Sequence, residues 1–319
     1  MLLNLVQNEV IKWIKRTSFY VMSGILVLLS VVSIIFIFMM DNGTPQERNG
    51  WATSDWRQAL EKENESLRET LSADVQFGHV NYMEKQLALN EYRLANDLEP
   101  NNENSVWTYM DSNIGLTSVV TLFVIIIAGG IVASEFTWGT IKLLMIRPIS
   151  RGKILLSKYM TVLIFGLIFY VLLFGTSYIV GAIGFGFANH PELLYINGTV
   201  YALSSFVSIL FKILLSSFSV LMFATFAFMI STVFRNNSLA IGLSLFLLFT
   251  GTQITQLVGT KYEWAKFSPF ANIHFDAYFH SFPIVEGTTL TFSIIMFLLY
   301  FGVFMFISFL TFKKRDIAA

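Results

Sequence analysis

Six long apolar stretches constrain this 319-residue chain more than any other feature of its sequence. A helix needs roughly 20 apolar residues to cross the hydrocarbon layer of a bilayer. Only helices and closed barrels satisfy their backbone in lipid, and these stretches lack the alternation of barrel strands. Charged residues make up 13% of the chain, against about 25% in soluble domains. The sequence therefore predicts an all-α polytopic membrane protein with six transmembrane helices, at 17–40, 113–134, 154–186, 212–234, 238–259 and 290–312.

The segment before the first span has two interpretations to weigh. Its basic residues could open a secretory signal, but the apolar part that follows is too long and ends without a small-x-small cleavage site, so we expect a retained span. Within 1–16, apolar residues recur at helical spacing opposite a polar face, which predicts a cytoplasmic interfacial amphipathic helix rather than a frayed terminus. The apolar residues are Leu3, Val6, Val10 and Trp13.

Charge separates the two sides of the predicted membrane domain. Cytoplasmic loops are rich in Lys and Arg. With six spans both termini lie on one side, and the N-terminal helix, the loop 135–153 and the tail 313–319 are all basic on that side. Between Asp41 and Asp111 the chain holds fourteen acids and six bases. We therefore expect a plasma-membrane protein with both termini cytoplasmic and the acidic segment 41–112 outside.

The segment 41–112 is too polar for lipid but carries two apolar stripes at helical spacing. These stripes predict two helices of about twenty residues folded back as an extracellular helical hairpin. The first stripe is Trp56, Leu60, Leu67 and Leu71, and the second is Val80, Met83, Leu87, Leu94 and Leu98. The segment 187–211 is expected to form an extracellular loop and the start of the fourth span.

Two further features on the outer side each have two readings. The segment 260–289 is aromatic and too polar to span, so it forms either a re-entrant lid or an ordinary aromatic belt. Lys212 lies at the outer end of the fourth run, where it either snorkels or faces a substrate path. The candidate path or lid residues are Lys212, Trp264, Phe267, Phe270, Phe275 and Tyr278.

The sequence offers no catalytic or metal constellation, so we do not expect an enzyme. It has no cysteine, and its four histidines form no His-Glu-x-x-His pattern. His274, Asp276 and His280 have a spacing that favours interfacial polar side chains over a metal site. The chain also lacks the Gly-x-x-x-x-Gly-Lys-Ser/Thr loop of an ATP site, so any ATP-driven step needs another subunit.

The loop 135–153 is short, basic and patterned. Thr137 to Ile146 is expected to form a helix that Pro148 ends, and Ser150 is expected to cap the next helix. Glu135 would lie where the second span meets the cytoplasm, able to pair with a base on the N-terminal helix or on a partner. The loop is either an ordinary basic connection or a handle for a partner ATPase.

A resemblance to a known family favours the second interpretation, in which the loop is a docking element for a partner ATPase. The pattern from Glu135 to Lys158, E-x-x-x-G-T-x-K-L-L-x-x-R-P-x-S-R-x-x-x-x-x-S-K, resembles the signature of ABC transporter permeases of the type 2 exporter family. "NEVIKWIKR" resembles that family's elbow helix, "FKKRDI" its usual end, and "NEYRLANDLEP" an outer loop of Gram-positive antibiotic- and bacteriocin-resistance members. The resemblance implies ATPase coupling by Glu135, Gly139, Thr140, Lys142, Leu143, Leu144, Arg147, Pro148 and Arg151.

The expected function is that of a permease subunit of an ATP-driven exporter. The resemblance implies two ABC ATPase subunits that bind ATP and Mg, a second permease chain that is the same or different, and no cofactor bound by this chain. The expected cargo is amphipathic or lipid-like, such as an antimicrobial peptide, an antibiotic or a lipid. The alternative is a membrane sensor or assembly protein whose hairpin binds a peptide or cell-envelope ligand. A neighbouring gene for a Walker-motif ATPase favours export, and a kinase pair alone favours sensing.

Overall fold

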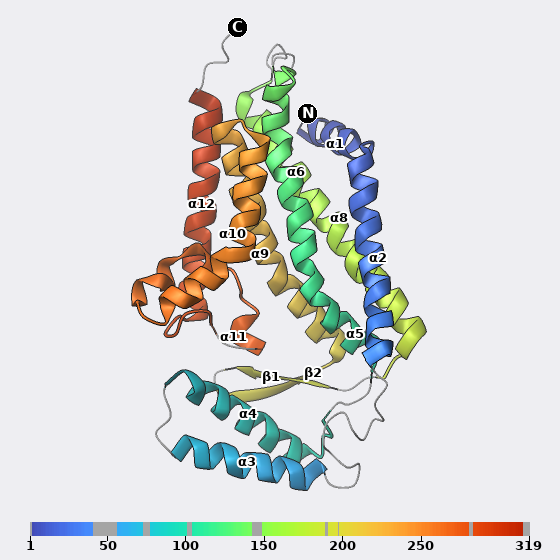
Figure 1. Ribbon diagram of the computed structural model, residues 1–319, viewed down its shortest axis with the longest axis vertical. Coiled ribbons are helices and arrows are strands. Elements are labelled where there is room, and N and C mark those ends of the chain that lie inside the picture. Colours follow the sequence, from blue (N-terminus) through green and yellow to red (C-terminus); the bar gives the residue numbers. More distant parts are fainter. Residues whose placement is uncertain are drawn as a thin grey trace.

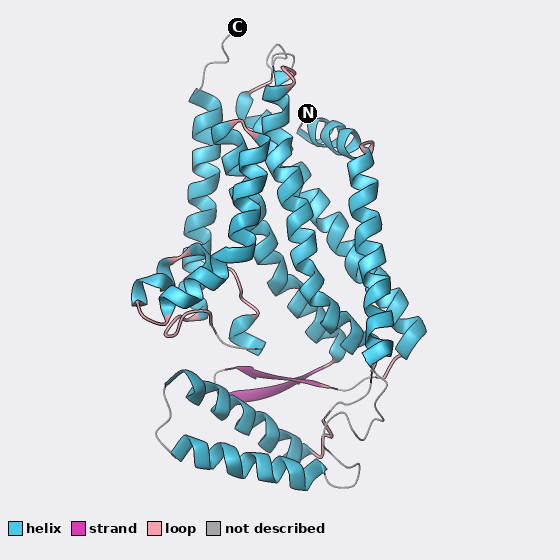
Figure 2. Cartoon of the chain, viewed as in Figure 1, coloured by secondary structure: helices cyan, strands magenta, loops and turns pink. Residues whose placement is uncertain are grey.

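Helices dominate the computed structural model, which describes residues 2–40, 56–72, 77–100, 104–141, 149–188, 191–196, 198–280 and 283–314 (Figure 2). Within this part of the chain, six helical segments are long and apolar enough to cross a membrane. Their main helices are α2 (Thr17–Met40), α6 (Thr117–Thr137), α8 (Arg151–Phe185), α9 (Ser205–Phe234), α10 (Asn237–Gly259) and α12 (Leu290–Lys314). The chain is an α-helical multi-pass membrane protein.

The second membrane segment is longer than the sequence predicts. α5 (Val106–Ser112) and the 3-10 helix η1 (Asn113–Leu116) precede α6, so the segment starts at Val106 instead of 113. Ser105 begins α5 with a reciprocal cap: Thr108 N donates to Ser105 Oγ at 3.3 Å, and Ser105 N donates to Thr108 Oγ1 at 2.7 Å. This capping box satisfies backbone donors that the first turn of a helix leaves free.

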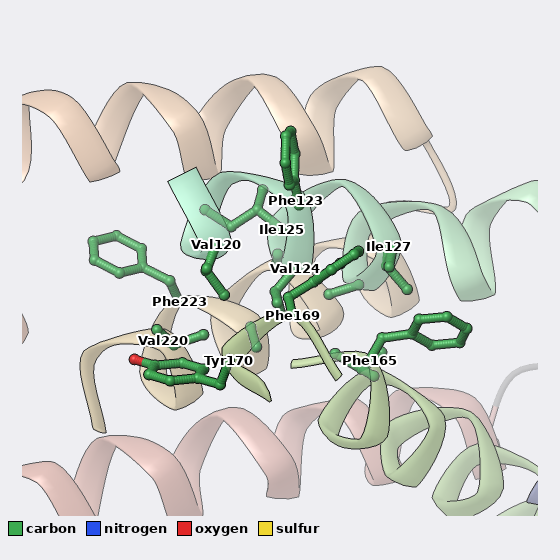
Figure 3. Packing of buried hydrophobic residues seen from close by; sticks show 14 of the residues in the cluster. Val120, Phe123, Val124, Ile125, Ile127, Phe165, Phe169, Tyr170, Val220 and Phe223 are labelled. Atoms are coloured by element: carbon green, nitrogen blue, oxygen red, sulfur yellow. The ribbon is translucent and has the colours of Figure 1, made fainter. Parts of the chain in front are cut away.

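The core of the membrane domain forms around α6, which packs against α8, α9 and α10 (Figure 1). Val124 and Ile125 of α6 are almost completely buried. Figure 3 shows α6 side chains beside Phe165 and Phe169 of α8 and side chains of α9. A Cβ added at Gly129 would lie only 2.8 Å from a side-chain carbon of Ile241. Glycine there lets α6 and α10 approach closely, as small residues do between membrane helices.

Several shorter elements lie at the two opposite ends of the bundle (Figure 1). At one end, called the loop end, lie α1 (Leu2–Ile14), the end of α6 and the end of α12. At the other end, called the hairpin end, lie α3 (Trp56–Ser72), α4 (Phe77–Asn96) and a two-stranded sheet. The basic N-terminal helix and the helices of the acidic segment therefore lie at opposite ends of the bundle.

The helices α3 and α4 form an antiparallel pair within the predicted segment. Arg57 pairs with Asp97, and Arg68 lies 2.7 Å from Glu91, so the start of each helix faces the end of the other. Leu60 is buried. α4 also contacts both strands of the sheet, which supplies the further packing that two isolated short helices lack.

The sheet between α8 and α9 was not predicted. Its strands are β1 (Glu192–Ile196) and β2 (Thr199–Leu203), antiparallel, with Glu192 opposite Leu203. Gly198 has a φ of 84° in the connection, which suits a tight hairpin turn that needs a left-handed residue. α9 then begins at Ser205, within the segment 187–211 that was expected to hold the start of the fourth span.

The aromatic segment after α10 folds into short helices. These are η2 (Glu263–Phe267), η3 (Pro269–Ala271) and α11 (Ala277–His280). Lys85 Nζ of α4 donates to the carbonyl oxygen of Phe279 in α11 at 2.6 Å. The segment therefore connects the pair formed by α3 and α4 to the membrane helices.

Two local predictions for the loop after α6 are wrong. α6 continues through Thr137, and Gly139 has a φ of 70°, so a helix cannot start at Thr137 and run through Gly139. Ser150 is the residue before α8, but its side chain makes no capping hydrogen bond. Ile141 is helical, and the rest of the predicted loop helix, residues 142–146, lies outside the described residues.

Candidate functional site

A fully buried lysine lies at the loop end of α8. The side chain of Lys158 is only 1% exposed, and its Nζ lies 3.2 Å from Glu9 Oε1 of α1 and 3.2 Å from Glu135 Oε1 of α6. A buried ammonium without a partner is strongly destabilising, so the two carboxylates account for its position. Lys158 thereby joins three helices that are distant in the sequence.

Glu135 uses both of its carboxylate oxygens. Its Oε1 accepts hydrogen bonds from Lys12 and Lys158, and its Oε2 accepts one from the hydroxyl of Thr140. The side chain of Glu135 is 2% exposed. Lys12 belongs to α1, so Glu135 pairs with a base on the N-terminal helix in addition to Lys158 of α8.

These residues form one site, called here the charge cluster: Glu9, Lys12, Glu135, Thr140 and Lys158. Two carboxylates and two ammonium groups balance its charge. Glu9 Oε2 is buried without a hydrogen bond among the described residues, 4.0 Å from Lys12 Nζ. A buried ion cluster adds little net stability, but removing one member leaves an uncompensated charge. The cluster therefore fixes the positions of α1, α6 and α8 relative to one another.

A cation–π stack extends this attachment to the loop itself. The guanidinium of Arg16 lies 4.0 Å from the Trp13 ring centroid and 5.1 Å from that of Trp138. Trp13 is buried in α1, and Trp138 follows the last residue of α6. Arg over an indole face is the favoured form of this interaction. The chain that leaves α6 is thus held against α1.

The other end of the loop is attached to α12. Arg151 begins α8, and its Nη1 donates to the carbonyl oxygen of Lys313 at 3.2 Å. Both ends of the loop 138–150 therefore meet fixed elements, α1 at its start and α12 at its end. A displacement of the loop would act on α6 and α8 directly, and on α1 through the charge cluster.

The predicted coupling residues divide into three groups. Glu135 and Thr140 are in the charge cluster, and Gly139 makes the left-handed turn between them. Arg151 binds α12 instead. The remaining predicted residues lie outside the described part of the chain: Lys142, Leu143, Leu144, Arg147 and Pro148.

Lys212 of α9 lies in a second ion-pair network at the hairpin end. Its Nζ is 2.7 Å from Asp111 Oδ1 of α5 and 3.2 Å from Glu192 Oε2 of β1. Glu192 also accepts a hydrogen bond from Ser208. Lys212 lines a cavity of about 670 Å³ between the end of α4, α5 and β1. It is held by carboxylates at the hairpin end of the bundle.

The aromatic candidates divide between core and surface. Phe275 is buried against Phe218 and Phe297, with ring centroids 5.0 and 5.5 Å apart. Trp264 and Phe267 are largely exposed. Phe270 packs on Phe223 of α9, and Tyr278 hydrogen-bonds the hydroxyls of Thr288 and Ser293. Phe267 also packs on Phe292 of α12, with ring centroids 5.7 Å apart, so the segment is anchored through four of the five aromatics.

Sequence reasoning missed Glu9 and the role of Lys158. In the sequence Lys158 stood out only as the last residue of the pattern. The available signal was a lysine inside an apolar run together with a glutamate on the amphipathic helix. Among the described residues, no group of three or more His, Asp or Glu side chains is arranged to hold a metal ion.

The fold and the charge cluster define a polytopic helical membrane protein with a fixed connection between its N-terminal helix and the loop after α6. The chain belongs to the family described as protein of unknown function DUF2705, which matches residues 77–318. It is 42% identical to uncharacterized protein YhcI of Bacillus subtilis strain 168, across 99% of this chain and all of that protein. It is 29% identical to uncharacterized membrane protein YdbK of the same strain, across 66% of this chain and 82% of that protein.

Proposed function

We propose that this chain is the transmembrane permease subunit of an ATP-driven ABC exporter. One observation carries the proposal. Glu135, Thr140 and Lys158 belong to the sequence pattern that resembles type 2 exporter permeases, and the three side chains meet in the charge cluster. They meet at the base of the loop to which the resemblance assigns ATPase coupling. A pattern spread over two helices and a loop thus corresponds to one physical site.

In this mechanism the loop 138–150 docks on an ATPase subunit. Two such subunits bind ATP and Mg and close on each other, and their closure moves the loop. The charge cluster passes this movement to α6, α8 and α1, because Lys158 and Glu135 bond to all three helices. The path then opens between this chain and a second permease chain. This chain itself binds no cofactor and catalyses no reaction.

The proposed orientation follows from charge. The loop end carries the basic segments and lies in the cytoplasm, with α1 as an interfacial elbow helix. The hairpin end carries the acidic segment and lies outside the plasma membrane. Among the described residues of the spans, ion pairs occur at the charge cluster and around Lys212 near helix ends. An interior of this kind favours an amphipathic or lipid-like cargo, such as an antimicrobial peptide, antibiotic or lipid, over a bare ion.

The test is copurification of an ABC ATPase with the tagged chain. Leu143 and Leu144 are the apolar loop residues expected to enter a groove on the ATPase. Each well-buried leucine contributes about 1.5–3 kcal/mol, and each 1.4 kcal/mol is tenfold in affinity. We expect the double variant Leu143→Ala/Leu144→Ala to lose most of the ATPase during purification and most ATP-dependent transport.

The matched control is Leu298→Ala/Leu299→Ala. These two leucines are also adjacent, and they are exposed on the surface of α12. This control should retain the ATPase. If the Leu143/Leu144 variant retains its ATPase and transports as wild type does, the loop is not the coupling element. If wild-type chain brings down no Walker-motif ATPase, the exporter proposal is wrong.

A further inference from the structure

A groove between α3 and α4 has the features of a ligand site. It is a cavity of about 500 Å³ on the pair α3 and α4, at the opposite end of the bundle from the charge cluster. Acidic side chains from both helices line it: Glu61 and Glu65 of α3 and Glu91 of α4. Leu94 supplies an apolar wall. The groove has no role in the proposed transport cycle.

The groove holds uncompensated negative charge. Glu91 is paired with Arg68, whose Nη2 lies 2.7 Å from Glu91 Oε1. Glu61 and Glu65 make no ion pair with another described residue. They stand one helical turn apart, where two like charges destabilise a helix. The helix thus carries a local electrostatic cost that a bound cation would relieve.

A buried amide provides the second, independent observation. Asn64 lies between the two glutamates, is only 4% exposed, and lines the groove. Its Oδ1 is buried and accepts no hydrogen bond from any described residue. Buried acceptors are nearly always satisfied, and leaving one unmade is costly. Asn64 therefore brings to the groove lining an acceptor for which the described residues supply no donor.

We propose that this groove binds an alkylammonium or guanidinium group, of the kind that basic peptide side chains carry. The N–H groups of the ligand donate to Asn64 Oδ1 and to the carboxylates of Glu61 and Glu65. The methylene groups of the ligand pack against Leu94, as the stems of basic side chains do on apolar surfaces.

The surrounding charge and the geometry both favour an organic cation. The segment from Asp41 to Asp111 carries fourteen acids and six bases, and such a field raises the local concentration of cations. The described acids form no group arranged to hold a metal ion. The site differs from the proposed export function, and its binding can be measured without an ATPase or transport.

The test uses the full-length protein in phosphatidylcholine nanodiscs, with fluorescein-labelled hexalysine as the probe and fluorescence anisotropy as the readout. Loss of one charge-assisted hydrogen bond raises a dissociation constant about tenfold. We expect such a rise for Asn64→Ala and at least the same for Glu61→Gln/Glu65→Gln. Labelled hexaglutamate should not bind.

Two matched controls separate a site from diffuse attraction. Glu69→Gln/Glu84→Gln removes the same net charge from α3 and α4 at residues that do not line the groove. Asn90→Ala removes a similarly buried amide that lies outside the lining and whose Nδ2, instead of its oxygen, has no partner among the described residues. Both controls should bind hexalysine within about twofold of wild type, since distant exposed charges contribute little.

Competition assigns the source of the cation. Displacement by unlabelled hexalysine but not by spermine supports a peptide, and equal displacement by spermine supports a free polyamine; either result retains the site. If the two glutamine double variants weaken binding equally, the attraction is diffuse and the proposal is wrong. Wild-type affinity in Asn64→Ala, or no binding by wild type, would also overturn it.

Discussion

Lys158 illustrates how one residue determines the geometry of the loop end. Its ammonium is removed from solvent and lies at equal distances of 3.2 Å from two carboxylates on different helices. Desolvation of such an ion costs about as much as its pairing returns. The residue is therefore better understood as a positional constraint on α1 and α6 than as a source of stability.

Replacing this lysine tests the constraint. Lys158→Met keeps an unbranched side chain and removes the charge, which leaves Glu9 buried with Lys12 at 4.0 Å as its nearest described base. Breaking a buried ion pair from one side costs about 3–5 kcal/mol. We expect a clearly lower thermal unfolding midpoint in detergent, followed by circular dichroism.

Lys153→Met is the matched control, because Lys153 is an exposed lysine on the same helix. Its midpoint should stay near that of wild type. Adding Glu135→Gln to Lys158→Met should destabilise by less than the two single changes combined, since both residues share one network. Additive effects, or an unchanged midpoint in Lys158→Met, would contradict the assigned pairing.

At the scale of elements, α11 connects the pair formed by α3 and α4 to the bundle. Lys85 of α4 bonds the carbonyl of Phe279, and the Phe279 ring packs edge-on against Phe211 of α9 with centroids 5.0 Å apart. Burial lowers the pKa of Lys85, which is the expected cost of placing an ammonium in this contact. A change in the outer pair thus has a direct route to α9.

Removing this contact should loosen α11 without unfolding the bundle. Lys85→Met keeps the aliphatic stem and removes the donor, and hydrogen bonds from charged groups contribute about 1.5–3 kcal/mol. We expect amide hydrogen exchange in residues 277–280 to become about tenfold faster. Lys62→Met, at an exposed lysine of α3, should leave these amides unchanged. Equal protection in both variants would show that α11 is held by packing alone.

The elements that the sequence predicts are those with local signals. Each span could be found because its apolar run is continuous, and α3 and α4 because their stripes repeat at helical spacing. The sheet was missed because a search for spans overlooks short strands, although Asn197-Gly198 between two apolar runs is a hairpin signal. The pairing of Glu135 with the N-terminal helix was anticipated, but the contact between Lys158 and Glu9 was missed because the two residues are 149 positions apart. No local pattern joins residues at that separation.

At the scale of the whole molecule, charge and shape divide the protein in the same way. The basic N-terminal helix and the end of α12 lie at one end of the bundle, and the acidic helix pair lies at the other (Figure 1). Positive charge near short loops favours retention on the cytoplasmic side. The proposed export direction and the proposed cation site both need the hairpin end to face outward. Orientation is therefore the property on which the most depends.

The absence of cysteine makes this orientation directly measurable. Ser66→Cys places a single thiol on an exposed position of α3, and Lys153→Cys places one on an exposed position at the start of α8. In intact cells, a membrane-impermeant maleimide should label Ser66→Cys and leave Lys153→Cys unlabelled. After permeabilisation both thiols should react, which shows that each one is accessible. Labelling of Lys153→Cys alone in intact cells would reverse the orientation, and with it the side on which an ATPase could bind.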